Sequence, residues 1–364
     1  MGTVTLQKSK NRLELVMPTP STSPATIIVL TREHLGDLIC TTPALRALRK
    51  HFPDAKITVE VGERAVSILE NNPHIDEIVV RPTHQGLSGK LDFVRFLRRR
   101  RFDMAVVLDD CADFSLYVWL GRVPQRVGLR RKKRFANLLT QSVPFDFAAH
   151  EMVDNFRNVV GSLDADISDP TTEVFPLKKD REAVAKMWTE LGIEDSERVI
   201  GFNPGASAPS NRWLPERFAE LGDLLLAQPH LKVVLFGGST DLEFAEEVRQ
   251  GMKKTPLVLT GELSVMELAE ALGKCAVVVT GDTGPMHLAV AMKTPVVALF
   301  GPADPAESGP GYAPSHTVIR KVAGCLNCTK YVCREDRACM KQITASEVAE
   351  AVFAHLGSPF VKEG

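Results

Sequence analysis

The sequence predicts an α/β protein built from two doubly wound domains, each a mainly parallel sheet with helices on both faces. Two series of alternating strand and helix patterns indicate this, over residues 26–129 and 199–300. An acidic, proline-containing stretch without periodicity, residues 164–179, separates the two series. With 364 residues, the chain is also long for one hydrophobic core and long enough for two.

The first series starts with a β-branched, apolar strand pattern directly after a polar segment. We expect strands at residues 26–30, 56–61, 77–80, 104–108 and 126–129. Helical patterns lie between them, at residues 37–51, 65–70, 91–99 and 114–120. Thr42-Pro43 is a cap-and-first-turn signal inside the first helix, so we expect two pieces or a kink there.

The second series repeats the alternation and ends in an isolated helical pattern. Strands are expected at residues 199–202, 231–236, 257–259, 276–279 and 296–300. Helices are expected at residues 215–227, 241–252, 265–272, 286–292 and 345–356. No Gly-x-Gly-x-x-Gly follows the first strand of the chain and no Gly-Lys-Ser/Thr loop is present, which argues against a nicotinamide dehydrogenase and a P-loop enzyme.

Composition excludes several classes of protein. The formal net charge of −1 gives no global field that would attract nucleic acid, so we expect no nucleic-acid partner. No apolar run reaches the ~18 residues of a membrane-spanning helix. Residues 1–24 are mostly polar and lack the apolar core of a secretory signal, which predicts a flexible tail on a cytoplasmic protein.

Residues 275–305 carry the most informative pattern, in which a buried strand is followed by Gly281-Asp282-Thr283-Gly284 and a helix that starts at Pro285. Free N–H groups at such a helix start, here of Gly284 and Met286, favour an anion. Thr283 and His287 add a hydroxyl and an imidazole. Two interpretations remain open: a phosphate-binding turn, or an ordinary capped turn with a structural histidine.

Two further loops end in side chains suited to group transfer. Asn203-Pro204-Gly205 closes the first strand of the second series, and Arg212 follows in the same loop, where a guanidinium can bind phosphate bidentately. Asp37 follows the first strand of the chain and suits a general base that accepts a hydroxyl proton. The alternatives are a surface arginine beside a packed Trp213, and a helix cap at Asp37.

Basic and cysteine clusters complete the candidates. Arg130, Arg131 and Arg134 lie near the expected cleft and suit a phosphorylated lipid headgroup, whereas the run 98–101 at a helix end fits a solvated surface. Four late cysteines have the spacing C-x2-C-x4-C-x5-C: Cys325, Cys328, Cys333 and Cys339. They predict either a structural zinc or iron–sulfur site or reduced packing thiols.

Three segments follow one another along the chain: GDLICTTPALRALRKHFPDAKITV, NPGASAPSNRWLPERFAEL and DTGPMHLAVAMKTPVVALFGPADP. In sequence and in order they resemble glycosyltransferase family nine, the bacterial ADP-heptose:lipopolysaccharide heptosyltransferases. The resemblance implies the GT-B fold, two Rossmann-like domains that face each other across a cleft. We accordingly assign residues 1–24 to a tail, 25–165 to the acceptor domain, 166–196 to a linker, 197–344 to the nucleotide-sugar domain, and 345–364 to a last helix that either stays there or crosses back to the first domain.

The resemblance also implies an activity, an inverting transfer of heptose from ADP-heptose to a lipid A–core acceptor, with peripheral contact to the inner membrane. Asp37 would be the base, and Asn203, Gly205, Arg212 and residues 282–287 would bind the donor. No Asp-x-Asp motif is placed at a strand end of the donor half, so we expect no catalytic metal and no required cofactor. Many family members have Lys-Arg-Trp where this chain has Asn211-Arg212-Trp213, which removes one cation. Another nucleotide sugar, another surface glycan, or a non-catalytic sugar-nucleotide-binding protein remain alternatives.

Overall fold

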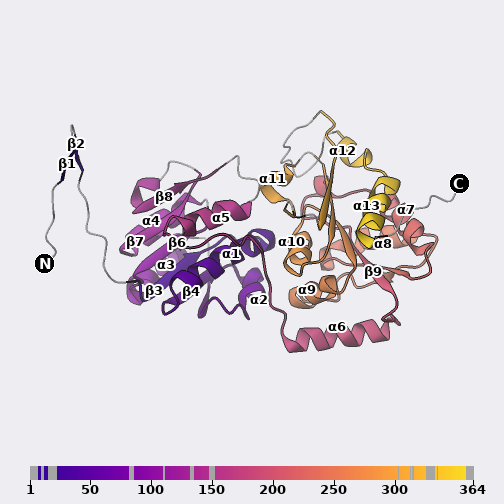
Figure 1. The fold of residues 1–364 in the computed structure, drawn as a ribbon, viewed down its shortest axis with the longest axis horizontal. Helices are drawn as coiled ribbons and strands as arrows, with labels where there is room; N and C mark the ends of the chain where they lie inside the picture. The colour runs from indigo at the N-terminus through magenta and orange to yellow at the C-terminus, as the bar shows by residue number, and fades with distance from the viewer. Residues whose placement is uncertain are drawn as a thin grey trace.

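The computed structural model describes residues 7–9, 12–14, 23–81, 86–109, 111–131, 135–146, 152–301, 303–311, 313, 315–324, 333 and 335–357. They form two parallel six-stranded sheets, one in each half of the chain, joined by an extended segment and a helix (Figure 1). Within the first 24 residues lies a short antiparallel ribbon, β1 (Gln7–Ser9) and β2 (Arg12–Glu14), which the sequence analysis did not predict.

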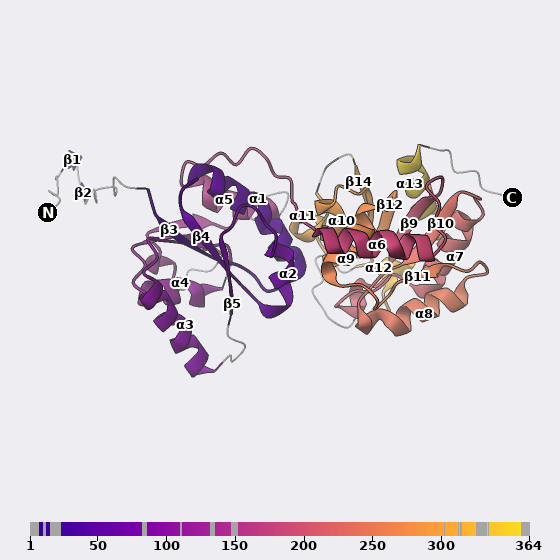
Figure 2. The ribbon, with the colours of Figure 1, turned by 90° about the horizontal axis from the view of Figure 1, so that it is seen from below.

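The first sheet has the strand order β5-β4-β3-β6-β7-β8. Its strands are β3 (Thr26–Leu30), β4 (Lys56–Val61), β5 (Glu77–Val80), β6 (Met104–Val107), β7 (Gln125–Arg130) and β8 (Gln141–Pro144). The helices α1 (Leu35–His51), α2 (Val66–Leu69) and α5 (Met152–Gly161) share a core with Ile27 and Val29. On the other face, α3 (Leu87–Arg100) and α4 (Ala112–Leu120) share a core with Ile28 and Leu30 (Figure 2). Alternate side chains of one strand therefore serve opposite faces.

The second sheet repeats the plan with the order β11-β10-β9-β12-β13-β14. Its strands are β9 (Arg198–Asn203), β10 (Leu231–Leu235), β11 (Leu257–Val258), β12 (Val277–Gly281), β13 (Val296–Phe300) and β14 (His316–Arg320). The larger helices around it are α6 (Lys178–Glu190), α7 (Pro215–Leu226), α8 (Leu242–Gly251), α9 (Val265–Gly273), α10 (Gly284–Ala291) and α13 (Ala345–Leu356). The strand order reverses between β3 and β6 and between β9 and β12, and ligands of doubly wound sheets bind at such switch points.

The sequence analysis left open that the last helix crosses back to the first half. Instead, α13 packs against α7, β12 and β13, and its Val348, Val352 and Phe353 belong to a core built from the second half alone. The physical reason is its apolar face, which is buried over its whole length on the second sheet.

Helix α1 is continuous through Pro43, where the sequence predicted two pieces or a kink. A proline at this position has no N–H to donate to the carbonyl of Ile39, four residues earlier. The hydroxyl of Thr42 donates to that carbonyl at 2.7 Å instead. The freed acceptor is therefore satisfied within the helix, which helps the helix to continue.

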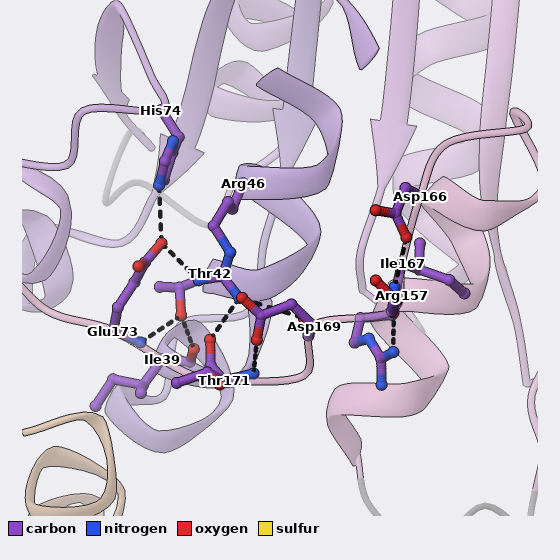
Figure 3. A network of polar contacts seen from close by, with 11 residues as sticks. Ile39, Thr42, Arg46, His74, Arg157, Asp166, Ile167, Asp169, Thr171 and Glu173 are labelled. Carbon is purple, nitrogen blue, oxygen red and sulfur yellow. Dashed lines mark hydrogen bonds and ion pairs between the residues drawn. The ribbon is translucent and has the colours of Figure 1, made fainter. Parts of the chain in front are cut away.

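The segment that joins the halves, residues 165–177, is tied to α1 by a polar network (Figure 3). The buried guanidinium of Arg46 lies 3.0 Å from the Asp169 carboxylate and 2.9 Å from the Glu173 carboxylate, and it donates to the Thr171 carbonyl. His74 contacts the same Glu173 carboxylate at 2.9 Å. Helix α6, which follows, packs against α9 of the second half. The connection is thus fixed to one half before residue 177 and to the other half after it.

Candidate active site

Asp37 lies at the start of α1, just beyond the carboxyl end of β3. The residue in the cap position is His34, so Asp37 is not the cap but belongs to the first turn of the helix. Its carboxylate is 23% exposed and lies 3.4 Å from the guanidinium of Arg32. The loop after β3 therefore provides both a carboxylate that solvent can reach and a cation beside it.

The turn after β12 has the geometry expected from its sequence. Helix α10 begins at Gly284, one residue before Pro285, and Thr283 occupies the cap position without a capping bond from its own side chain. The Thr283 hydroxyl lies 3.1 Å from the Thr280 hydroxyl and 3.3 Å from the amide nitrogen of Asn203. These contacts join the ends of β9 and β12, the two strands at the switch point.

The amino-terminal turns of α1 and α10 are in direct contact. A Cβ atom on Gly36 would lie 2.5 Å from the imidazole ring of His287, and one on Gly284 would lie 2.6 Å from the Leu35 side chain. The Cys40 sulfur lies 3.7 Å from Nδ1 of His287. Only glycine leaves room at both positions. The two glycines therefore allow the first turn of α1, which carries Asp37, to contact the first turn of α10.

Burial sets the protonation of two side chains at this contact. Burial raises the pKa of Asp282 to about 6, while a hydrogen bond from Ser308 lowers it and the negative charge of Asp37 raises it further. Burial lowers the pKa of His287 to about 4, against the opposing effect of Asp37. At neutral pH the site therefore holds a neutral imidazole, which can donate a hydrogen bond but adds no positive charge.

Arg212 lies in the loop between β9 and α7. Its Nε donates to the Ala206 carbonyl at 3.0 Å, its Nη2 lies 3.7 Å from the carboxylate of Asp241, and its guanidinium stacks over Phe244 at 5.4 Å. A Cβ on Gly205 would lie 2.2 Å from that same Asp241 carboxylate. Gly205 thus leaves space for Asp241, a residue that the sequence analysis missed because a lone aspartate before a helix reads as an ordinary cap.

Asn203 is buried, with 2% exposure, at the end of β9. Its amide nitrogen contacts the Gly205 carbonyl and the hydroxyls of Thr280 and Thr283, all within 3.3 Å. Its side-chain oxygen has no hydrogen-bond partner among the described residues. In this structure, Asn203 therefore positions the loops around the site.

Comparisons with known proteins agree with this architecture. A family model described as "Glycosyltransferase family 9 (heptosyltransferase)" matches residues 91–339, more than half of the chain. The chain belongs to glycosyltransferase family 9. It is 27% identical to lipopolysaccharide heptosyltransferase 2 of Salmonella typhimurium over 310 residues, which cover 82% of this chain and 88% of the relative.

Solved structures resemble this glycosyltransferase over nearly its whole length. A family 9 glycosyltransferase from Veillonella parvula aligns with a TM-score of 0.80 at 28% identity, covering 91% of this chain and 97% of the other. The Escherichia coli ADP-heptose heptosyltransferase II aligns with a TM-score of 0.72 at 24% identity, covering 91% and 98%. The expected GT-B fold of two Rossmann-like halves is confirmed.

The first half of this glycosyltransferase contains a charged cluster that the sequence analysis did not single out. Glu60 is fully buried at the end of β4, and the guanidinium of Arg81 pairs with it and with Glu33 while donating to the Thr31 carbonyl. Burial raises the pKa of Glu60, and Arg81 opposes that effect. Glu33, Glu60 and Arg81 come from separate loops or strand ends, so no local sequence pattern predicts the cluster.

Of the basic residues proposed for the acceptor, two lie in the described part of the chain. Arg130 ends β7, and Arg131 lies 4.0 Å from the Glu307 carboxylate of the second half and stacks over Phe145 at 4.7 Å. Arg134 lies outside the described residues. Arg131 therefore spans the two halves in this arrangement, in addition to its predicted acceptor role.

The cysteine cluster is described only in part, because Cys325 and Cys328 lie outside the described residues. Cys333 accepts a hydrogen bond from the Arg337 N–H, and Cys339 is buried in the short helix α12 (Ala338–Lys341). Among the residues that the structure describes, no group of three potential ligands could hold a metal ion. Metal site and packing thiols both remain predictions.

A cavity of about 390 Å³ adjoins the site between the halves. Its walls include Cys40 of α1, His287 and Val290 of α10, Thr172 of the connecting segment and His316 of β14. The cavity therefore lies between α1 and α10, next to the contact of their first turns.

Proposed function

We propose that this glycosyltransferase transfers heptose from ADP-heptose to the inner core of lipopolysaccharide, with inversion at the anomeric carbon and without a catalytic metal. The observation that carries the proposal is the direct contact between the Asp37 helix of one half and the turn from Asp282 to His287 of the other. The names of the similar proteins, lipopolysaccharide heptosyltransferase 2 and ADP-heptose heptosyltransferase II, support the choice of donor and acceptor.

In the proposed reaction, Asp37 accepts the proton of an acceptor hydroxyl while the hydroxyl oxygen attacks the anomeric carbon from the face opposite the leaving group. The new C–O bond forms as the bond to the diphosphate oxygen breaks, so the configuration inverts in one displacement. The proton ends on Asp37, and the electron pair leaves with ADP.

The leaving diphosphate gains negative charge, which needs donors that are already in place. Candidates are the first N–H groups of α10, the Thr283 hydroxyl, the neutral His287 and the guanidinium of Arg212. Arg212 already faces Asp241 at 3.7 Å, a distance long enough that the diphosphate can compete for the guanidinium. The second half thus binds the nucleotide and the first half binds the acceptor.

Asp37→Asn tests the assignment of the base. We expect kcat to fall by about two orders of magnitude or more, with the affinity for ADP unchanged, because an amide cannot take the proton. Asp92→Asn, an exposed change on α3, is the matched control and should leave both quantities unchanged. Near-normal turnover by Asp37→Asn would exclude Asp37 as the base.

The proposed metal independence is tested by adding EDTA. We expect the transferase activity to be retained. Loss of activity that Mg²⁺ or Mn²⁺ restores would contradict the proposal. Thermal unfolding must be followed in the same samples, because EDTA could also strip a structural metal from the cysteine cluster.

The proposed location is the cytoplasm, with peripheral contact to the inner membrane where a glycolipid acceptor resides. Within the described ranges, no helix is both long and apolar enough to cross a bilayer. Another nucleotide sugar or surface glycan remains the second candidate, because the missing cation at Asn211 changes the donor loop. Competition by a panel of nucleotide sugars against ADP binding distinguishes the donors.

A further inference from the structure

The outer face of the α3–α4 layer exposes large apolar side chains. Helices α3 and α4 bury Phe93, Leu97, Phe114 and Val118 against the first sheet. Between these buried positions, the two helices also expose large apolar side chains: Leu87 is 75% exposed, Leu91 46% and Trp119 47%. In Figure 2 these helices cover the side of the first sheet opposite α1 and α5. We call the exposed side chains of α3, α4 and the turns after them the outer face.

The same face is strongly basic. Within its 14 residues, α3 has a single acidic side chain, Asp92, against five basic ones: Lys90, Arg95, Arg98, Arg99 and Arg100. Arg101 and Arg122 follow the ends of α3 and α4 and are exposed. The whole chain has a net charge of only −1, so this excess is local.

Four arginines, Arg98, Arg101, Arg122 and Arg126, contribute to the walls of two adjoining depressions of about 510 and 440 Å³. Arg98 and Arg122 line both depressions, Arg101 lines the first, and Trp119 lines the second. Guanidinium groups that converge in this way can bind phosphate oxygens bidentately. An exposed indole beside them is amphipathic and suits the boundary between water and lipid.

Apolar and basic residues share one stripe of α3. Leu87, Leu91 and Arg95 follow one another at intervals of four residues, which places them on one side of a helix. Arginines in the last turn also interact favourably with the helix dipole. In addition, Arg98 donates a hydrogen bond to the Leu120 carbonyl. That structural role explains the position of the arginines but gives no reason for the two exposed leucines before them.

The direction of α3 relates this stripe to the active site. In a parallel α/β unit the helix runs against the strands, so its amino end lies at the carboxyl edge of the sheet. Leu87 is therefore at the same edge as Asp37, which follows the carboxyl end of β3. A glycolipid in a membrane that contacts Leu87 and Leu91 would extend its sugars toward that edge of the sheet.

We propose that the outer face binds a bilayer rich in anionic lipids. Leu87, Leu91 and Trp119 enter the interface, and the arginines contact lipid phosphates. This proposal rests on the proposed function, which supplies a membrane-anchored acceptor. A bilayer fits better than a soluble anion, because it offers an apolar layer and a plane of phosphates side by side.

Flotation of the full chain with vesicles tests the proposal. We expect binding to vesicles of phosphatidylcholine with phosphatidylglycerol, weaker binding to phosphatidylcholine alone, and a decrease with salt. The pair Leu87→Ser and Leu91→Ser should lower the partition coefficient by at least about tenfold, since two leucines lose their burial. The pair Arg99→Gln and Arg122→Gln should lower it by about 25-fold, roughly fivefold per charge.

The matched control is the pair Leu242→Ser and Arg249→Gln on α8 of the second half, where the leucine is 50% exposed. It should bind vesicles as the wild type does. Thermal unfolding should be unchanged in all three pairs, because every substituted side chain is exposed. The wild type failing to float with anionic vesicles, or both outer-face pairs floating as well as the control, would overturn the proposal.

Transfer assays with two acceptors distinguish a failure of this inference from a failure of the proposed function. Transfer to a delipidated, water-soluble acceptor should be equal in the wild type and all pairs, whereas transfer to the acceptor in vesicles should fall in the two outer-face pairs alone. If the wild type transfers to neither acceptor, the proposed function fails, and flotation still decides the membrane face.

Discussion

Asp282→Asn should stabilise this glycosyltransferase at neutral pH. In the folded chain, burial raises the pKa of Asp282 from 3.8 to about 6, with a further contribution from Asp37. A raised carboxyl pKa means that the folded state binds a proton which the unfolded state has released. Stability is therefore lost as pH rises from about 4 to about 6, and an amide, which stays neutral, avoids that loss.

The size of the effect follows from the shift. A difference of about two pKa units corresponds to up to about 3 kcal/mol of unfolding free energy. His287 acts in the opposite direction, because its pKa falls from 6.5 to about 4 and the unfolded state takes up its proton first as pH drops. The contribution of His287 to stability therefore increases as pH rises over nearly the same range. The two contributions oppose each other in the wild type, so its stability should change little over this range.

The difference between variant and wild type isolates Asp282. Urea unfolding should give equal stability at about pH 4 and an advantage for Asp282→Asn of up to about 3 kcal/mol at about pH 7. Asp92→Asn on the exposed side of α3 is the control and should show no pH-dependent gain of this size. An advantage of Asp282→Asn that is no larger at neutral pH than at acidic pH would refute the reasoning.

Three further substitutions test other contacts. Gly36→Ala should reduce kcat/KM and lower the melting temperature, because its Cβ would lie 2.5 Å from the ring of His287; unchanged kinetics and melting would contradict the close contact. Arg46→Ala should cost about 3 kcal/mol in urea unfolding, because it removes the buried guanidinium that pairs with Asp169 and Glu173, while Arg249→Ala, which breaks an exposed pair, should leave the unfolding free energy nearly unchanged. Arg212→Ala should weaken ADP binding in calorimetry by about 10- to 100-fold, and equal affinity would remove Arg212 from the donor site.

The sequence by itself determined the elements that have strong apolar patterns. The strands at Thr26–Leu30, Lys56–Val61, Glu77–Val80 and Val296–Phe300 and the helix Ala345–Leu356 have the predicted bounds. Buried strands need near-continuous apolar runs, and an amphipathic helix needs its period, so the signal is local. The turn between β12 and α10 was predictable for the same reason, since Gly, Asp, Thr and Pro specify a strand-to-helix turn within a few residues.

Weakly patterned elements were missed. The edge strand β8 has mostly exposed side chains, and β14 is also an edge strand with only Ile319 buried. Strands that pack on one side at the margin of a sheet need few apolar residues. Helix α6 was assigned to the linker because its first turn is charged, although Val184, Met187 and Trp188 pack against the second half.

Only the tertiary structure decided which distant residues meet. Gly36 and His287 are 251 positions apart by their numbers, and nothing in either local pattern pairs a glycine of one helix with a histidine of another. The neutral state of His287 and the raised pKa of Asp282 follow from the burial that this contact creates. Local sequence patterns specify how each loop turns, whereas the packing of the two halves determines the dielectric environment in which its side chains titrate.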